Sequence, residues 1–113
     1  MRTEPVAAIL ERGWCQGVYA RDSRGHEVAP SDPSATSWCL RGAIVKAYGE
    51  TTDASVNYRM MLLDLCDDFK RCSITTWNDT PSRTKAEVVA LAKRADEEYN
   101  RIAIASNNEE ERG

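Results

Sequence analysis

The sequence predicts a mainly α-helical domain, a compact bundle of about four helices with a small β-hairpin after the first helix. Apolar residues recur every three or four positions in four segments, which is the spacing of a helix face. Residues that cap or end helices lie at the ends of these segments. One turn-forming tetrapeptide, "DSRG", separates two short segments that are expected to be strands. A chain of 113 residues has the length of one domain. We expect residues 1–105 to form it and residues 106–113 to be a flexible acidic tail.

The first helix is expected from about Glu4 to Arg12. Thr3 can cap its amino terminus, Pro5 suits the first turn, and Gly13 ends it. Its apolar stripe consists of Val6, Ile9 and Leu10.

A β-hairpin is expected directly after this helix. Val18–Arg21 and His26–Val28 are the expected strands, and Asp22–Gly25 is the turn between them. An aspartate at the first turn position bonds nearby backbone N–H groups, and a glycine at the last accepts positive φ. A hairpin this short is marginal alone, so it must pack on the helices.

The second helix is expected to open at Ser31 or Asp32, with Pro33 in its first turn and Gly49 at its end. Its small residues would let another helix approach closely, so a homodimer through this face is possible. The predicted core face comprises Ala35, Trp38, Cys39, Gly42, Ala43 and Lys46 or Ala47.

The third helix is expected from Asp53 to about Lys70 and to be the most buried, because Met60 and Leu63 widen its apolar stripe. Ser73–Thr76 is rich in β-branched residues and is expected to be a short extended piece before a turn-rich loop. The stripe itself consists of Tyr58, Met61, Leu62, Leu65, Cys66 and Phe69.

The fourth helix is expected from Lys85 to about Ile102. Thr84 and Glu87 have the spacing of a capping box, in which each bonds the other's backbone N–H. The core predicted for the whole domain is Ile9, Leu10, Trp38, Cys39, Ala43, Met61, Leu62, Leu65, Phe69, Val88, Leu91 and Ala95.

Charge and hydropathy exclude some classes of function. The net charge is −3 and the sequence pI is about 5.2, which argues against nucleic-acid binding because that needs a basic surface. We expect no membrane span, because no apolar run approaches the ~20 residues that a bilayer requires. The amino terminus does not resemble a signal peptide, so we expect the cytoplasm, or the host cytoplasm if the protein is viral.

The four cysteines are expected to be free thiols. They include no C-x-x-C pair and are accompanied by one histidine, so we expect no metal site. No cofactor motif is present, and we expect no cofactor.

Cys15, His26 and Asp79 are the residues that a cysteine hydrolase could use, with Asp79 or Asn78 orienting the histidine. Cys15 follows a helix carboxyl terminus, whose partial negative charge raises a thiol pKa, whereas activated cysteines favour helix amino termini. We therefore assign no catalytic residue and expect Cys15 to be a small apolar filler.

Two polar stretches are the candidate binding residues, the segment after the first helix and the loop before the last. One interpretation is that the loop holds an anion near a helix amino terminus, and the other is that its short polar side chains brace the backbone. Gln16 and Arg21 would join this network if the hairpin packs beside the loop. The candidate binding residues are Trp14, Gln16, Tyr19, Arg21, Trp77, Asn78, Asp79 and Arg83.

The stretches "GWCQG", "ARDSRG", "WCLRGA" and "SITTWND", followed by "RTKAEVVAL", resemble a family of small bacterial and phage proteins of unknown function. The W-x-Q-G, C-x-x-G-A and W-N-D elements carry the resemblance, which covers roughly residues 5–95. It implies a single domain and a phage or prophage setting, and it supplies no catalytic residues.

Small size, acidity and aromatic residues beside polar loops favour a non-enzymatic protein-binding module, a phage or prophage accessory protein that engages or inhibits a bacterial protein. Two alternatives stay open. One is a small-ligand binder or enzyme at Gln16, Trp77, Asn78, Asp79 and Arg83, with the Cys15 and His26 hydrolase as its least unlikely chemistry. The other is a nucleic-acid binder, which the acidity makes the weakest.

Overall fold

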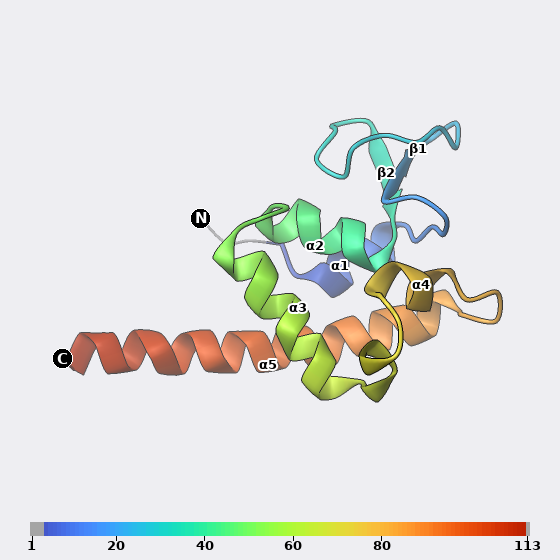
Figure 1. Cartoon of the computed structure of the whole chain (residues 1–113). Coiled ribbons are helices and arrows are strands. Elements are labelled where there is room, and N and C mark those ends of the chain that lie inside the picture. The colour runs from blue at the N-terminus through green and yellow to red at the C-terminus, as the bar shows by residue number, and fades with distance from the viewer. Residues whose placement is uncertain (1–3, 113) are drawn as a thin grey trace.

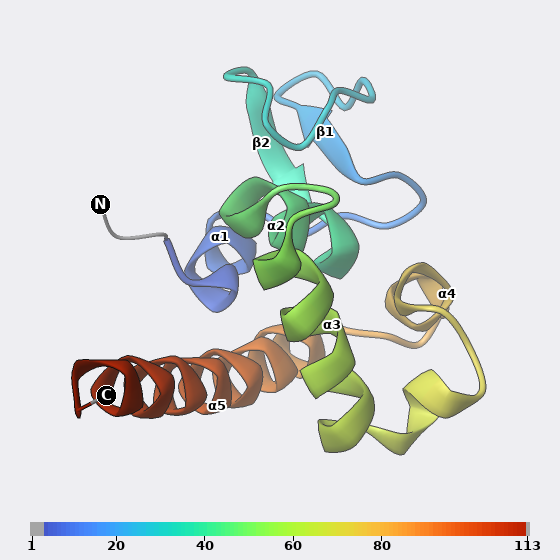
Figure 2. The same ribbon diagram turned by 60° about the vertical axis from the view of Figure 1, so that its left-hand side comes forward.

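The computed structural model describes residues 4–112 and confirms a mainly helical chain with a small antiparallel pair of strands after the first helix. In Figures 1 and 2 the strands lie at one end of the molecule, α5 lies along the opposite edge, and α1, α2 and α3 lie between them. The elements are α1 (Val6–Arg12), β1 (Ala20–Asp22), β2 (Ala35–Trp38), α2 (Leu40–Tyr48), α3 (Asp53–Leu65), the 3-10 helix η1 (Asp67–Lys70), α4 (Ile74–Asp79) and α5 (Lys85–Arg112).

The core lies where α1 and α3 pack on α5 and where α2 packs on α1. Every residue of the predicted core is buried except Leu65, which is half-buried. The apolar stripes found by periodicity therefore identify most of the packed side chains.

The capping box at the start of α5 is confirmed. Thr84 Oγ1 accepts from the Glu87 N–H at 3.2 Å, and Glu87 Oε1 accepts from the Thr84 N–H at 3.0 Å. The helix extends to Arg112, beyond the predicted end near Ile102, and so runs through positions 106–112 of the predicted tail.

The predicted hairpin is present at its turn, but its second segment is not the regular strand that pairs with β1. Asp22 Oδ1 accepts from the backbone N–H groups of Arg24 and His26, each at 2.9 Å. The regular strand partner of β1 is β2, in the register Ala20↔Trp38. The predicted strand His26–Val28 joins β1 through an isolated antiparallel bridge, Arg21↔Glu27, and two backbone hydrogen bonds, from the Asp22 N–H to the His26 carbonyl at 2.9 Å and from the Val28 N–H to the Ala20 carbonyl at 3.1 Å.

The predicted start of the second helix is wrong by about seven residues. Asp32, expected to cap it, closes a local turn by accepting from the Ser34 N–H at 2.8 Å. Residues 35–38 are extended in β2, so α2 starts at Leu40 with Cys39 as its cap. Local turn chemistry and a helix cap use the same residue types, and the tertiary pairing of β2 decides between them.

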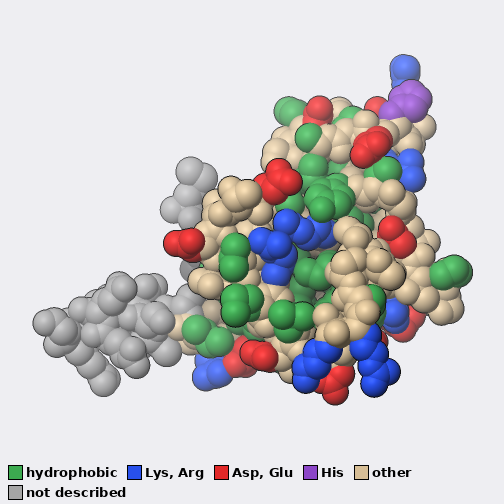
Figure 3. Space-filling model, viewed as in Figure 1, with side chains coloured by type: hydrophobic (Ala, Val, Ile, Leu, Met, Phe, Trp, Pro, Cys, Tyr) green, Lys and Arg blue, Asp and Glu red, His purple; other side chains and the backbone are tan. Residues whose placement is uncertain are grey.

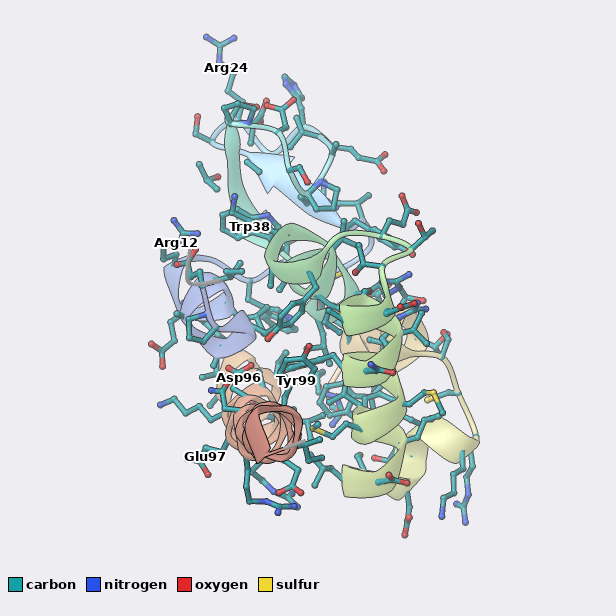
Figure 4. The ribbon with its side chains drawn as sticks, turned by 90° about the vertical axis from the view of Figure 1, so that its left-hand side faces the viewer. Arg12, Arg24, Trp38, Asp96, Glu97 and Tyr99 are labelled. Carbon is teal, nitrogen blue, oxygen red and sulfur yellow. The ribbon has the colours of Figure 1, made fainter. Side chains whose placement is uncertain are left out.

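Trp38 belongs to β2 rather than to a helix, and it is buried between two cations. The Arg12 guanidinium and the Lys46 ammonium lie 5.2 and 5.6 Å from its ring centroid. Figure 4 shows Arg12 beside this ring. The indole N–H donates to the Pro30 carbonyl at 3.0 Å.

Gly42 lets α2 approach the chain's own backbone, not another helix. A Cβ atom there would overlap the Tyr19 carbonyl oxygen. The Gly42–Ala43 face is buried against this segment, so the face suggested for a homodimer is covered.

Gly42→Ala is therefore expected to lower the free energy of unfolding by about 2 kcal/mol, as overpacking does, despite alanine's better helix propensity. Urea denaturation of both proteins measures this difference. Gly25→Ala is the control that lacks a clash, because nothing lies within 4 Å of an added Cβ and only the positive φ of 84° opposes it. A Gly42→Ala protein as stable as the wild type would contradict the close approach.

The third predicted helix is shorter than expected, and the predicted extended piece is helical. α3 ends at Leu65 because Cys66 is extended, with φ −141° and ψ 113°. After η1, Ser73 caps α4 by accepting from the Thr76 N–H at 3.1 Å. Phe69 and Trp77 then meet edge to face, with ring centroids 5.3 Å apart.

Asp96 on α5 caps the amino terminus of α1, which has no cap of its own. Asp96 Oδ2 accepts from the Ala7 N–H at 2.9 Å, and Oδ1 accepts from the Val6 N–H at 3.3 Å. Tyr58 of α3 donates its hydroxyl to Oδ1 at 2.8 Å. Burial raises the pKa of this phenol, so the hydroxyl remains a donor at neutral pH. Figure 4 shows Asp96 and Tyr99 together where α5 faces the core. One carboxylate thus joins three helices.

Candidate functional site

The segment after α1 and the end of α4 form a single polar network, which joins residues more than sixty positions apart. Gln16 and Arg21 join it as expected. Trp14, Asn78 and Asp79 are the other predicted residues within it, whereas Tyr19 lies elsewhere.

Asn78 is the centre of this network and is fully buried. Its Oδ1 accepts from Trp14 Nε1 at 2.7 Å and from the Leu40 N–H at 3.0 Å. Its Nδ2 donates to the Cys15 carbonyl at 3.1 Å and to Asp79 Oδ1 at 3.0 Å. The amide therefore has a partner for each of its four hydrogen-bonding positions, and it holds the first turn of α2 against the segment after α1.

Gln16 and Asp79 extend the network towards the surface. Gln16 Nε2 donates to the carbonyls of Asn78 and Thr80, at 2.9 and 3.1 Å. Asp79 Oδ1 accepts from the Gly17 N–H at 2.9 Å. Arg21 connects the network to the hairpin, because its guanidinium donates to the Gln16 carbonyl at 3.1 Å and to the Gly25 carbonyl at 2.9 Å.

Trp77, one of the candidate binding residues, is buried on α4. The side chain is 5% exposed, and its Nε1 donates to Asp68 Oδ2 at 3.2 Å. The Arg83 guanidinium carbon lies 3.9 Å from the ring centroid, and Arg83 Nε donates to the Trp77 carbonyl at 3.0 Å. Arg83 also pairs with Glu87, with Nη1 and Oε2 3.2 Å apart. Trp14 is half-buried, so neither tryptophan is a freely exposed anchor.

Tyr19 lies outside the network and contacts the start of α2 through its backbone. Its carbonyl accepts from the Cys39 N–H at 3.1 Å, where α2 begins. Its ring lies under the Arg41 guanidinium, 5.9 Å from the centroid, and borders a hollow of about 430 Å³ that also contains Glu27 and Glu50.

The network satisfies its own hydrogen bonds, and the backbone carbonyls and N–H groups of the chain are its main partners. Its residues lie close together, as a ligand site would require, but their polar atoms bond one another and the backbone. The bracing interpretation therefore describes these contacts, and a ligand would have to break them to bind here.

Cys15 and His26 do not meet. The Cys15 thiol lies 3.8 Å from the Val18 carbonyl, and burial raises its pKa, with the side chains of Ser37 and Arg21 acting in the opposite direction. His26 is exposed in the turn, with its Nδ1 3.7 Å from Asp22 Oδ2. A hydrolase needs a base beside the thiol, and this histidine bonds within its own turn.

α3 carries a surface that the sequence analysis missed. Met60, Leu63 and Val56 are 59%, 40% and 39% exposed, although Met60 and Leu63 were expected to widen a buried stripe. Figure 3 shows hydrophobic side chains gathered on this face of the molecule. The sequence contains one signal of this exposure. The apolar stripe of α3 is wider than one packing face, so one side of it must face solvent.

Two hollows border this helix. The first, of about 290 Å³, lies between α3 and the η1–α4 segment and is called the α3 groove below; it is lined by Val56, Arg59, Met60, Leu63, Phe69, Cys72, Ser73 and Ile74. The second, of about 390 Å³, lies between α3 and α5 and has Asp64 and Glu98 at its edge.

Within residues 4–112, none of the helices combines the length and the hydropathy needed to cross a bilayer. The described residues also contain no group of three or more side chains placed to hold a metal ion.

The comparisons with known proteins give one match. The model of a family described as a family of unknown function, DUF6197, matches residues 4–98. No curated protein and no solved structure matches the chain. The matched range contains the polar network, the two strands and the α3 groove, and it covers most of the sequence. The chain therefore belongs to DUF6197, a family of unknown function.

Proposed function

We propose that this chain is a non-enzymatic protein-binding module and that it binds its partner through the outer face of α3. The observation that carries the proposal is the exposure of Val56, Met60 and Leu63 beside the α3 groove. These residues lie four and three positions apart, so they form one stripe along the helix. Large apolar side chains grouped at a hollow are typical of protein interfaces.

The partner segment that fits this surface is an amphipathic helix with an acidic flank. Phe69 and Ile74 give the α3 groove an apolar floor, and the α3 stripe forms one wall. Arg59 is the charged residue in the lining, and its Nε donates to the Ser55 carbonyl at 3.3 Å. Apolar anchors would enter the groove, and a carboxylate of the partner would pair with Arg59.

The resemblance in sequence supports the setting that we propose. The partner would be a bacterial protein, and the chain would be a phage or prophage accessory protein that engages or inhibits it in the cytoplasm. The acidic character of the chain favours a protein partner over nucleic acid.

Met60→Glu is expected to weaken partner binding by at least about tenfold, because it places a charge in an apolar contact. Wild-type and variant chains, immobilised at equal density, capture proteins from a bacterial lysate, and quantitative mass spectrometry compares each captured protein. Asn57→Glu is the matched control, because it adds the same charge on the same helix beside the other hollow.

The supporting result is a protein captured by the wild type and by Asn57→Glu but lost with Met60→Glu. Equal capture by all three chains would contradict the proposal. Urea denaturation confirms that both variants stay folded, and both are expected to lie within about 0.5 kcal/mol of the wild type because the sites are exposed.

A further inference from the structure

We propose that Cys15 and Cys39 are a pair that forms a disulfide when the folded protein meets a peroxide, and that this modification removes the cap of α2. The chain contains four cysteines, and all four are free thiols in the structure. The proposal rests on the register that joins the segment after α1 to the end of β2.

That register is fixed by a parallel bridge between Trp14 and Trp38. The Trp38 N–H donates to the Gly13 carbonyl at 3.0 Å, and the Cys15 N–H donates to the Trp38 carbonyl at 3.1 Å. The next residue in each segment is a cysteine. Paired extended segments lie ~4.8 Å apart, which is within the ~4.4–6.8 Å between Cα atoms that a disulfide spans.

The two thiols also lie on the same side of this pair. Trp14 and Trp38 lie opposite each other in the parallel bridge, so the residues that follow them, Cys15 and Cys39, project from the same face of the pair. Cys39 is still extended, with φ −77° and ψ 172°.

Two carbonyls of the segment after Cys15 contact the two cysteines. The Val18 carbonyl lies 3.8 Å from Cys15 Sγ, and the Tyr19 carbonyl accepts the Cys39 N–H at 3.1 Å. Neither Cys66 nor Cys72 belongs to this part of the fold, because both follow α3. The fold therefore selects one pairing out of those that four cysteines allow.

The chemistry is a two-step oxidation. The Cys15 thiolate attacks hydrogen peroxide and becomes a sulfenic acid, and hydroxide leaves and is protonated to water. The Cys39 sulfur then displaces the sulfenic oxygen, which also leaves as water, so two thiols and one peroxide give one disulfide and two waters. Burial raises the pKa of both thiols, that of Cys39 to about 11, so the reaction is slower than that of an exposed thiol.

The disulfide changes how α2 begins. In the reduced protein Cys39 Sγ accepts from the Gly42 N–H at 3.2 Å. A bond to Cys15 turns this sulfur away from the helix, so Gly42 loses its acceptor, whereas Leu40 keeps its bond to Asn78. Opening of the first turn of α2 should therefore increase in the oxidised form.

The experiment treats the folded, reduced protein with hydrogen peroxide, blocks the remaining thiols, and digests it with trypsin without reduction. Each cysteine falls in a separate tryptic peptide; Cys15 is in residues 13–21 and Cys39 is in residues 25–41. The expected product is these two peptides joined with the loss of two hydrogen atoms. It should persist in a Cys66→Ser/Cys72→Ser variant and be absent in Cys15→Ser and Cys39→Ser.

Two results would overturn the pairing. One is that peroxide joins Cys15 to Cys66 or Cys72 as often as to Cys39. The other is that the Cys15–Cys39 product forms no more in the folded protein than in urea. Amide exchange of Gly42 tests the uncapping. It should be faster after oxidation, and unchanged exchange in a protein carrying the disulfide would overturn that part of the proposal.

Discussion

Asn78→Ala is expected to lower the free energy of unfolding by about 4 kcal/mol, the largest effect of any single substitution considered. The change removes the partner of three buried or half-buried groups, the Trp14 indole N–H, the Leu40 N–H and the Cys15 carbonyl, and each unsatisfied buried group costs ~1–3 kcal/mol. It also leaves a cavity between α2, α4 and the segment after α1, which adds to the loss. Denaturation in urea at constant m-value measures the effect.

Asn100→Ala is the control, because this residue is exposed on α5 and the substitution favours a helix. Asn78→Asp keeps the shape but replaces two donors with an acceptor, and it places a second carboxylate beside Asp79. It should therefore also be destabilised, and increasingly so as the pH rises above the carboxyl pKa. A loss below about 1 kcal/mol for Asn78→Ala would show that the network does not hold the fold together.

Asp96→Ala is expected to cost about 3 kcal/mol, the second largest effect. It removes the only side-chain acceptor that the structure gives to the Val6 and Ala7 N–H groups, and it leaves the Tyr58 hydroxyl with its longer bond to the Ala92 carbonyl at 3.3 Å. Tyr58→Phe, which removes one donor and keeps the carboxylate, should cost less. Circular dichroism during thermal unfolding compares the three proteins.

The pH dependence of stability tests the charge of Asp96. Burial raises the pKa of this carboxyl, and the bonds from Ala7, Tyr58 and Val6 offset only part of that. The folded protein therefore binds a proton more readily than the unfolded chain between the ordinary carboxyl pKa and the raised one. The contribution of protonated Asp96 to the free energy of unfolding is complete below this pH window and is lost as the pH rises through it.

Asp96→Asn cannot titrate, so this component of the slope should disappear from a plot of unfolding free energy against pH. Asp53→Asn, at an exposed position, controls for the general loss of a carboxylate. Identical slopes for the wild type and Asp96→Asn would contradict the raised pKa.

The parts of the fold that the sequence predicts correctly are those that periodicity and local capping determine. The α5 capping box and the start of α3 are set by residues within a turn of each other. The start of α2 is set by the pairing of Ala35–Trp38 with β1, some fifteen residues away, and no local pattern reports that pairing. α4 has six residues, too few for a periodic signal, and depends on packing of Trp77 against Phe69.

For the candidate site, the sequence likewise predicts one part, the residues, and not the other, their role. Residue type alone singled out Gln16, Arg21, Asn78 and Asp79, and all four do meet. Their role could not be read from type, because a polar loop that binds a ligand and one that braces the backbone use the same side chains. The exposure of Met60 and Leu63 depends on where η1 and α4 leave α3 uncovered, which is a property of the tertiary arrangement.

The cap that Asp96 provides for α1 has a consequence for synthesis of the chain. A ribosome makes α1 before α5, at ~5–20 residues per second, and Asp96 follows 90 positions after Val6. Until α5 emerges, the nascent α1 has neither its cap nor the helix that it contacts more than any other element. α1 is thus completed only after the segment that carries Asp96 has been made, and until then it is open to chaperones and proteases.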